Sequence, residues 1–184
     1  TVDSLDHSYY TNGILSHNTI VAAVFLMYNT IFNYDTNVGI AANKFQTAVE
    51  IMDKIKEMMN YLPFFMKPGV KVNNQAMMTF DNGCRIIAQA TTKRSFIGYT
   101  IHTLYLDEFA HVEPHVLDEF YENIMPTVSS MEDSKIIVTS TPNGYNKFFD
   151  IYQGAVDGRN SYHPIRVDWW QVPGRDDAWK EKMI

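Results

Sequence analysis

The strongest limit on the fold of this chain is an apolar run at residues 103–106 that ends in two adjacent carboxylates, Asp107 and Glu108. Such a run of strand-favouring residues is typical of a strand buried on both faces, as in a parallel sheet. Open α/β sheets bind ligands at the carboxyl edge of their strands. One carboxylate there can hold the water shell of Mg²⁺, and the other can orient or deprotonate an attacking water. A buried strand that simply runs into an acidic loop is the alternative.

Composition favours one soluble globular domain, with at most a small appendage. The chain has 184 residues, and 46% of them are hydrophobic, which is enough to bury one sizeable core. The longest apolar run, residues 20–28, is too short to span a bilayer, and no secretory signal is evident. The single cysteine, Cys84, fits a reducing cytoplasm. The net charge of −6 gives no support for broad adhesion to nucleic acid, so we expect any basic patch to be local.

The first eighteen residues differ in character from the rest of the chain. They are polar, and Asn12-Gly13 lies between two short runs that could pair as a hairpin. After Asn18, apolar residues recur at spacings of three and four, which predicts an amphipathic helix that begins at Thr19. These residues are Ile20, Ala23, Val24, Met27, Tyr28 and Ile31. We therefore expect a boundary between Asn18 and Thr19.

This first segment resembles the C-terminal end of an intein. The matching residues are His7, Tyr9, Tyr10, Asn12-Gly13-Ile14-Leu15, His17-Asn18 and the adjoining Thr19. The Asn18 amide can cyclise on its own carbonyl and cleave the chain, while His17 donates or relays a proton. Thr19 would be the hydroxyl nucleophile that receives the upstream segment. The resemblance implies that residues 1–18 are an intein remnant that does not splice by itself. A polar arm with a chance Asn-Gly turn is the alternative.

Thr19 also has a second interpretation, as part of a phosphate-binding loop. In such loops a Ser or Thr comes after lysine at the first position of a helix and ligates Mg²⁺. The glycines and the lysine of that loop are not in this chain. We expect them on an upstream segment whose ligation would place Thr19 directly after the lysine. An ordinary N-cap threonine is the alternative.

The middle of the chain predicts alternating strands and helices. We expect a buried strand at residues 37–43, an amphipathic helix at 44–60, and an irregular connection at 62–69. Residues 77–80 and 84–90 should then form a hairpin around Asp81-Asn82-Gly83. The next loop, 91–100, contains the only Lys-Arg pair, Lys93-Arg94. Either side chain could contact phosphate of ATP or DNA, although a solvated loop is the simpler interpretation.

A second strand with a polar end comes after the carboxylates. His111 and His115 have a spacing that suits a metal, but Pro114 favours a helix start there and no third ligand is evident. After a helix at residues 116–125, we expect a second buried strand at 134–138, which ends in hydroxyls. In a parallel sheet its end should lie beside Asp107, so that Ser140, Thr141 and Asn143 could hydrogen-bond a γ-phosphate or the lytic water. An ordinary strand-to-turn transition uses the same residue types.

Together these features resemble the large terminase subunit of tailed bacteriophages. The resemblance rests on the Asp107-Glu108 strand, on residues 139–144 (Thr-Ser-Thr-Pro-Asn-Gly) and on the aromatic segment at residues 145–150. Such subunits have an N-terminal RecA-like P-loop ATPase domain and a C-terminal nuclease domain. The resemblance implies an α/β fold with a mainly parallel sheet, incomplete at its N-terminus, over residues 19–160. Residues 161–184 would begin the connection toward a second subdomain and the nuclease domain, which is absent.

The same resemblance implies roles for individual residues. Asp107 would be the Walker B ligand of Mg²⁺, Glu108 the catalytic base, and Ser140-Thr141 the motif that couples the state of the γ-phosphate to DNA movement. The family usually has an Arg-Gly pair before the Asp-Glu strand. Here the matching dipeptide is Ile97-Gly98, and Arg94 is the nearest substitute for that arginine.

The implied function is ATP hydrolysis coupled to threading double-stranded DNA into a procapsid, in the cytoplasm of the host cell. ATP and Mg²⁺ are the implied ligands, and the partners are a portal, a small terminase subunit, the upstream segment and further copies of the chain, with no membrane involved. The chain alone should be inactive or nearly so, because the phosphate loop is missing. A helicase-type ATPase, a splicing half with a passenger extein, and a non-catalytic scaffold are the alternatives.

Overall fold

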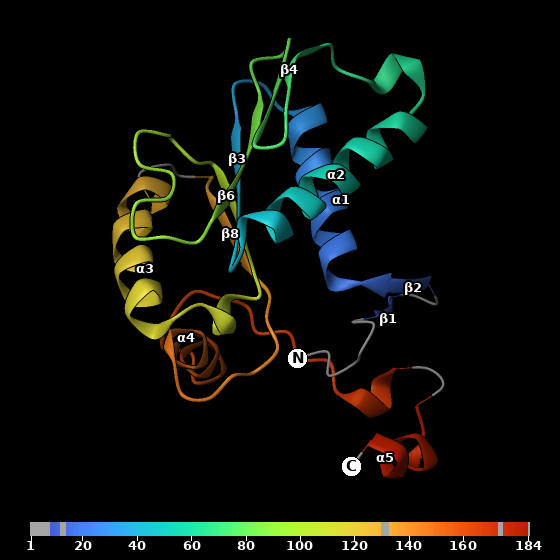
Figure 1. The fold of residues 1–184 in the computed structure, drawn as a ribbon, viewed down its shortest axis with the longest axis vertical. Coiled ribbons are helices and arrows are strands. Elements are labelled where there is room, and N and C mark those ends of the chain that lie inside the picture. The colour runs from blue at the N-terminus through green and yellow to red at the C-terminus, as the bar shows by residue number, and fades with distance from the viewer. Residues whose placement is uncertain (1–7, 12–13, 130–132, 173–174, 184) are drawn as a thin grey trace.

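A six-stranded sheet with the strand order β4-β5-β6-β3-β7-β8 forms the centre of the computed structural model, which describes residues 8–11, 14–129, 133–172 and 175–183 (Figure 1). Four neighbouring strands run parallel: β6 (Arg85–Ala90), β3 (Asn37–Ala42), β7 (Thr103–Asp107) and β8 (Lys135–Val138). The antiparallel strands β4 (Val70–Asn73) and β5 (Met77–Phe80) complete one side. The predicted α/β fold with a mainly parallel sheet is confirmed.

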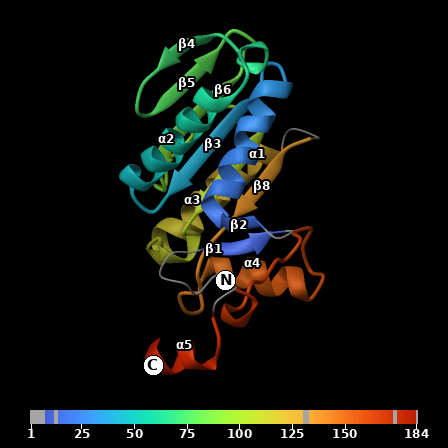
Figure 2. The ribbon, with the colours of Figure 1, turned by 90° about the vertical axis from the view of Figure 1, so that its right-hand side faces the viewer.

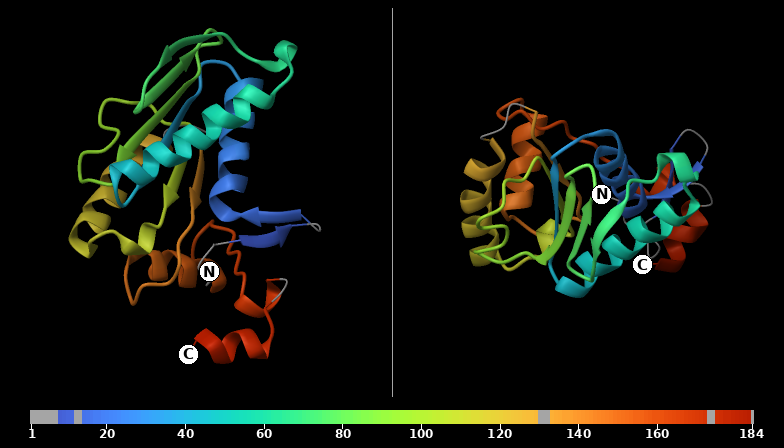
Figure 3. Two further views of the ribbon diagram at one scale, coloured as in Figure 1. Left: turned by 45° about the vertical axis from the view of Figure 1, so that its right-hand side comes forward. Right: turned by 90° about the horizontal axis from the view of Figure 1, so that it is seen from above.

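Helices cover both faces of this sheet (Figures 1 and 3). On one face lie α1 (Asn18–Phe32) and α2 (Phe45–Tyr61), and on the other lie α3 (Pro114–Ser129) and α4 (Lys147–Val156). All five residues of β7 are buried, as expected for a strand with a core on each side. Tyr105 belongs to the core under α1 and α2, whereas Leu104 and Leu106 belong to the core under α3 and α4. This alternation arises from the two-residue period of a strand.

Helix α1 exists as predicted, but its buried face differs from the apolar series in the sequence. Its buried residues are Ala22, Ala23, Leu26, Asn29 and Thr30. In contrast, Ile20, Val24 and Tyr28 are 39%, 45% and 55% exposed. The small side chains of the two alanines allow close packing of α1 on the core that it shares with α2, and Leu26 fills that core from the same face.

Several elements were not expected from the sequence. These are β4, α4, α5 (Asp177–Met183) and the short 3₁₀ turns η1 (Phe64–Met66), η2 (Phe109–His111) and η3 (Trp169–Gln171). Helix α3 also continues past Pro126 to Ser129, beyond the predicted end at residue 125. Val128, in its last turn, is 1% exposed and packs in the core under α3 and α4, which accounts for the longer helix.

A hairpin precedes α1 and is separate from the main sheet. Strands β1 (Ser8–Thr11) and β2 (Ile14–His17) pair antiparallel, which confirms the predicted hairpin, although its turn at Asn12-Gly13 and residues 1–7 lie outside the described part. Figure 2 shows this hairpin and α5 toward the same end of the molecule, away from β4. Within the described residues, no helix combines the length and apolar character that crossing a membrane requires.

Candidate functional site

The carboxyl ends of the parallel strands meet at one edge of the sheet. Ala42, at the end of β3, is paired with Asp107 of β7 on one side and with Ala90 of β6 on the other. Beside β7, strand β8 ends opposite Leu106, and the Thr139 N–H then donates to the Leu106 carbonyl at 2.9 Å. The predicted meeting of the Asp-Glu strand with the hydroxyl-bearing strand is therefore confirmed.

Asp107 lies in a cluster of hydroxyl groups and is only 6% exposed. Its Oδ1 accepts hydrogen bonds from the Tyr105 hydroxyl at 2.7 Å and from Thr139 Oγ1 at 2.9 Å. Tyr105 reaches Asp107 because residues two apart on a strand share a face. Two hydroxyl donors on one oxygen fix the orientation of the carboxylate. We call Tyr105, Asp107 and Thr139 the carboxylate–hydroxyl cluster.

Thr19 joins this cluster from the start of α1, because its side chain hydrogen-bonds the Tyr105 hydroxyl. The two residues expected to hold Mg²⁺, Thr19 and Asp107, therefore contact the same tyrosine hydroxyl. Both offer oxygen atoms, the ligand type that Mg²⁺ prefers, so the donor set fits this ion. Burial, and then the charge of Asp107, raises the pKa of Tyr105 well above its ordinary value, which keeps the phenol a neutral donor.

Glu108 lies at a sharp turn immediately after β7. Its backbone is left-handed, with φ of 50° and ψ of 40°, a conformation that costs a non-glycine residue about 1–2 kcal/mol. Its Oε2 is 3.4 Å from His111 Nε2 and 3.5 Å from Thr141 Oγ1, and the latter two atoms are 2.7 Å apart. The expected base thus lies beside an expected coupling residue, Thr141. Residues in such strained conformations are concentrated at functional sites.

Ser140 and Asn143 bind the turn that comes after Glu108. The buried Ser140 hydroxyl accepts from the Ala110 N–H at 3.0 Å and donates to the Thr141 carbonyl at 2.9 Å. The Asn143 amide donates to the Ala110 carbonyl at 3.2 Å. Both side chains therefore tie the end of β8 to the end of β7. Their hydrogen bonds to a γ-phosphate or lytic water remain a prediction.

Arg94 lies on loop 91–100, which leaves the same sheet edge at the end of β6. Thr91 N–H donates to the Ala42 carbonyl at 2.8 Å and so holds the start of the loop at this edge. Lys93 pairs with Glu119 at 2.5 Å, whereas Arg94 is exposed and forms no ion pair with any residue in the described ranges. The structure does not bring Arg94 into contact with Asp107 or Glu108, and its phosphate contact remains a prediction.

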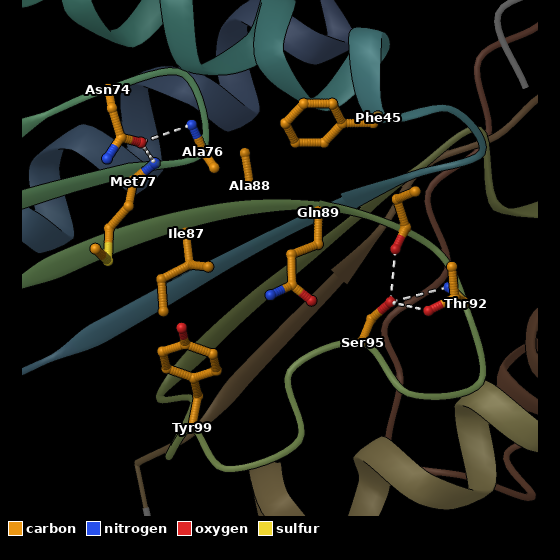
Figure 4. A pocket seen from close by; sticks show the side chains of 11 residues that line it. Phe45, Asn74, Ala76, Met77, Ile87, Ala88, Gln89, Thr92, Ser95 and Tyr99 are labelled. Atoms are coloured by element: carbon orange, nitrogen blue, oxygen red, sulfur yellow. Dashed lines mark hydrogen bonds between the residues drawn. The ribbon is translucent and has the colours of Figure 1, made fainter.

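A separate hollow lies between loop 91–100, the start of α2 and strands β5 and β6 (Figure 4). Phe45, Ile87, Gln89 and Tyr99 are among the side chains that line it. It includes no residue of the carboxylate–hydroxyl cluster. The hollow is therefore distinct from the site at the ends of β7 and β8.

The structure tests less of the predictions for His17, Asn18 and His115. Strand β2 ends at His17 and α1 begins at Asn18, one residue before the expected boundary, and the side chains of these two residues are outside the described part. His115 pairs with Glu113 at 3.5 Å on the surface. Within the described ranges, no three His, Cys, Asp or Glu side chains gather as a metal site.

Three residues of the site were not assigned from the sequence: Tyr105, Thr139 and His111. A signal was available for the first two. Tyr105 precedes Asp107 by the two-residue period that puts side chains on one strand face, and Thr139 comes directly after the strand expected beside it. The contact of His111 depends on the turn at Glu108, for which the sequence pattern held no signal.

The fold and the position of its acidic residues define an α/β domain of the RecA-like kind. The profile of one family, described as "Terminase large subunit, T4likevirus-type, N-terminal", matches residues 18–184. The chain therefore belongs to this family of terminase large subunits. Residues 1–17, which include the β1–β2 hairpin, lie outside the match.

Solved structures of phage terminases share the fold. The large terminase of bacteriophage HK97 is 18% identical with a TM-score of 0.66, over 77% of this chain and 31% of that protein. The large terminase of the thermophilic bacteriophage D6E, in complex with ADP, is 17% identical with a TM-score of 0.65. That match covers 90% of this chain and 41% of that protein. The ATPase domain of the Thermus phage P74-26 large terminase is 18% identical with a TM-score of 0.55. That match covers 73% of this chain and 59% of that protein. The chain thus spans about a third to three fifths of these proteins.

Proposed function

We propose that this chain is part of a viral DNA-packaging motor, which hydrolyses ATP once the chain is joined to a segment that carries a phosphate loop. The observation that carries the proposal is the contact of Thr19, Tyr105, Asp107 and Thr139, drawn from three separate elements to one sheet edge. Family membership supports it. So do the structures of the phage D6E large terminase in complex with ADP and with ATP-γ-S.

Each residue at this edge has a role in the proposed reaction. Asp107 and Thr19 are the residues that would hold Mg²⁺, and the bound ion would neutralise charge on the β- and γ-phosphates. Tyr105 and Thr139 orient the Asp107 carboxylate through its Oδ1. Glu108 accepts a proton from the attacking water, and Thr141 links this base to the segment after β8. Backbone amides and a lysine of the upstream segment would bind the phosphates.

In the motor, hydrolysis would drive double-stranded DNA into a procapsid in the host cytoplasm. The proposed partners are a portal, a small terminase subunit and further copies of the chain. Binding to DNA would be mainly to phosphates and strongly dependent on salt. The net charge of −6 gives no support for broad adhesion to DNA, so we propose a local cationic contact, with the exposed Arg94 as the candidate.

The test is ATP turnover by the full-length protein with Mg²⁺, compared with the present chain alone. We expect the full-length protein to hydrolyse ATP and the isolated chain to be nearly inactive, because it lacks the phosphate-binding loop. Packaging of linear double-stranded DNA into purified procapsids tests the coupling. A full-length protein that neither binds ATP-γ-S nor hydrolyses ATP would contradict the proposal.

We propose separately that residues 1–18 are an intein remnant, which splicing would remove. Two observations support a different origin for this segment: the family match begins at residue 18, and the β1–β2 hairpin is outside the six-stranded sheet. An intein lodged before Thr19 would interrupt the phosphate loop and keep the ATPase inactive until ligation. Mixing the chain with the upstream segment should give a ligated product with Thr19 directly after Gly-Lys. Another junction, or ATP hydrolysis before ligation, would refute this proposal.

A further inference from the structure

His111 lies between the proposed base and the segment after β8. Its Nε2 is 2.7 Å from Thr141 Oγ1 and 3.4 Å from Glu108 Oε2. The Thr141 hydroxyl in turn donates to Glu108 Oε2 at 3.5 Å. When Nε2 carries its proton and donates to Thr141, the Thr141 O–H is left to donate to Glu108. The three side chains then form one chain of donors that ends at the carboxylate.

The backbone around His111 is tied to the same segment. The Phe109 N–H donates to the Thr139 carbonyl at 3.2 Å, and the Ala110 N–H donates to Ser140 Oγ at 3.0 Å. The Asn146 amide donates to the Ala110 carbonyl at 2.9 Å, while its Oδ1 caps the start of α4. The turn that carries His111 is therefore fixed to residues 139–146 by bonds from both sides.

We propose that His111 is a positioning residue, which acts through Thr141 to hold the Glu108 carboxylate in one orientation for its role as base. This inference rests on the proposed ATPase function. Glu108 itself lies on a left-handed turn, and its carboxylate contacts both Thr141 and His111, which can fix its direction. Misplacing a base by about 1 Å is enough to lower a rate by about a hundredfold.

The nearby His115 offers a matched control. It lies four residues further on, in the first turn of α3, its side chain is 64% exposed, and its contact is with Glu113 at the surface, at 3.5 Å. The side chain of His111 is 39% exposed, so replacing it should leave the fold intact. The two histidines therefore differ mainly in whether they contact the proposed site.

The experiment compares His111→Ala, His111→Gln and His115→Ala in the full-length protein by steady-state ATP hydrolysis. We expect His111→Ala to lower kcat about tenfold while KM for ATP changes by less than about twofold, because the base and not the binding site is disturbed. His111→Gln should restore most of the rate, since its amide N–H can donate to Thr141. His115→Ala should match the wild type, and thermal unfolding should be similar for all.

A second variant approaches the same contact from the other side. Thr141→Val should also lower kcat, and the double variant with His111→Ala should be no slower than the slower single variant, because both break one chain of bonds. Additive losses, an unchanged or raised kcat in His111→Ala, or no recovery in His111→Gln would overturn the inference. A wild-type protein without turnover would instead refute the proposed function, as would a Glu108→Gln variant as fast as the wild type.

Discussion

The edge of the sheet where the parallel strands end has two differently built halves. The acidic half lies at the ends of β7 and β8, and the exposed half lies at the ends of β3 and β6 with loop 91–100. At the ends of β7 and β8, side chains of Asp107 and Glu108 bond to hydroxyls of Thr139 and Thr141, in the segment directly after β8. Beside the ends of β3 and β6, loop 91–100 bonds to itself and to the backbone of these two strands. Ser95 Oγ donates to the Ala90 carbonyl at 2.6 Å and also accepts from the Thr92 N–H at 2.9 Å.

The difference shows what sheet topology alone provides. Parallel strands bring all four ends to one edge, but side chains meet across strands only where the strands are neighbours and both ends carry polar groups. Strand β3 ends in Ala41 and Ala42, which offer nothing to Asp107 or to loop 91–100 beyond the backbone. Hydrogen bonds therefore hold the side chains of the acidic half in place, while Arg94 on the exposed half faces solvent.

The greatest loss of activity should come from replacing Glu108, in the acidic half of the edge. Glu108→Gln keeps the shape of the side chain but removes the proton acceptor, so kcat of the full-length protein should fall by about 10²–10⁴-fold. Binding of ATP-γ-S should stay within about twofold of the wild type, because the change affects the reaction step and not the phosphate contacts. The control is Glu113→Gln, whose side chain is 75% exposed. Equal losses in both variants would show that the two carboxylates do not differ as proposed.

A smaller effect is expected when the orientation of Asp107 is loosened. Tyr105→Phe removes one of the two donors to Oδ1 and the contact with Thr19, and it leaves the ring in the core. We expect kcat to fall by about three- to tenfold, with a higher Mg²⁺ concentration at half-maximal rate, for a lost hydrogen bond of about 1 kcal/mol. The control is Tyr34→Phe, at a residue 79% exposed. If the Mg²⁺ concentration at half-maximal rate is the same in Tyr105→Phe and the wild type, Tyr105 does not contribute to the proposed Mg²⁺ site.

The acidic half of the edge was largely predictable from the sequence. The apolar run before Asp107 indicated a strand buried on both faces, which is confirmed, and a second apolar strand before Ser140 indicated that the two ends meet. These inferences hold because strand burial and parallel pairing depend on short-range patterns. Thr19 was expected at the helix start on similar grounds, and its contact with Tyr105 brings it to the same place. The second strand, β8, was also expected to be buried, but this was wrong, because its residues are half-buried or exposed at the border of the sheet.

The remaining features depend on packing and on backbone conformation that patterns do not encode. The inward face of α1 holds Ala22, Ala23 and Leu26, whereas the apolar Ile20, Val24 and Tyr28 are exposed. The approach of His111 to Glu108 requires a left-handed residue and then a 3₁₀ turn, and a glutamate gives no sign of that conformation. Arg94 stayed apart because β3 separates β6 from β7 in the strand order.

The exposed half of the edge should show a modest and salt-dependent effect. Arg94→Ala removes a cation available to phosphate, so we expect binding of ATP-γ-S or of double-stranded DNA to weaken about two- to fivefold at low salt. The difference should shrink as salt is added. Lys93→Ala is the matched control, because Lys93 is already paired with Glu119. If Arg94→Ala has no effect on either ligand at low salt, the Arg94 side chain only faces solvent.

The weakest effect should appear in the alkaline unfolding of the protein. Burial raises the pKa of Tyr105 in the folded chain, so the unfolded chain loses this proton first as the pH rises. The stabilisation is therefore complete below about pH 10, the ordinary pKa, and falls above it by up to about 1.4 kcal/mol per pH unit. Tyr105→Phe should show a shallower loss above that pH, measured by urea unfolding at a series of pH values. Tyr162→Phe should do the same, because burial also raises the pKa of Tyr162. Parallel curves for Tyr105→Phe and the wild type above pH 10 would mean that the Tyr105 phenol is not held neutral beside Asp107.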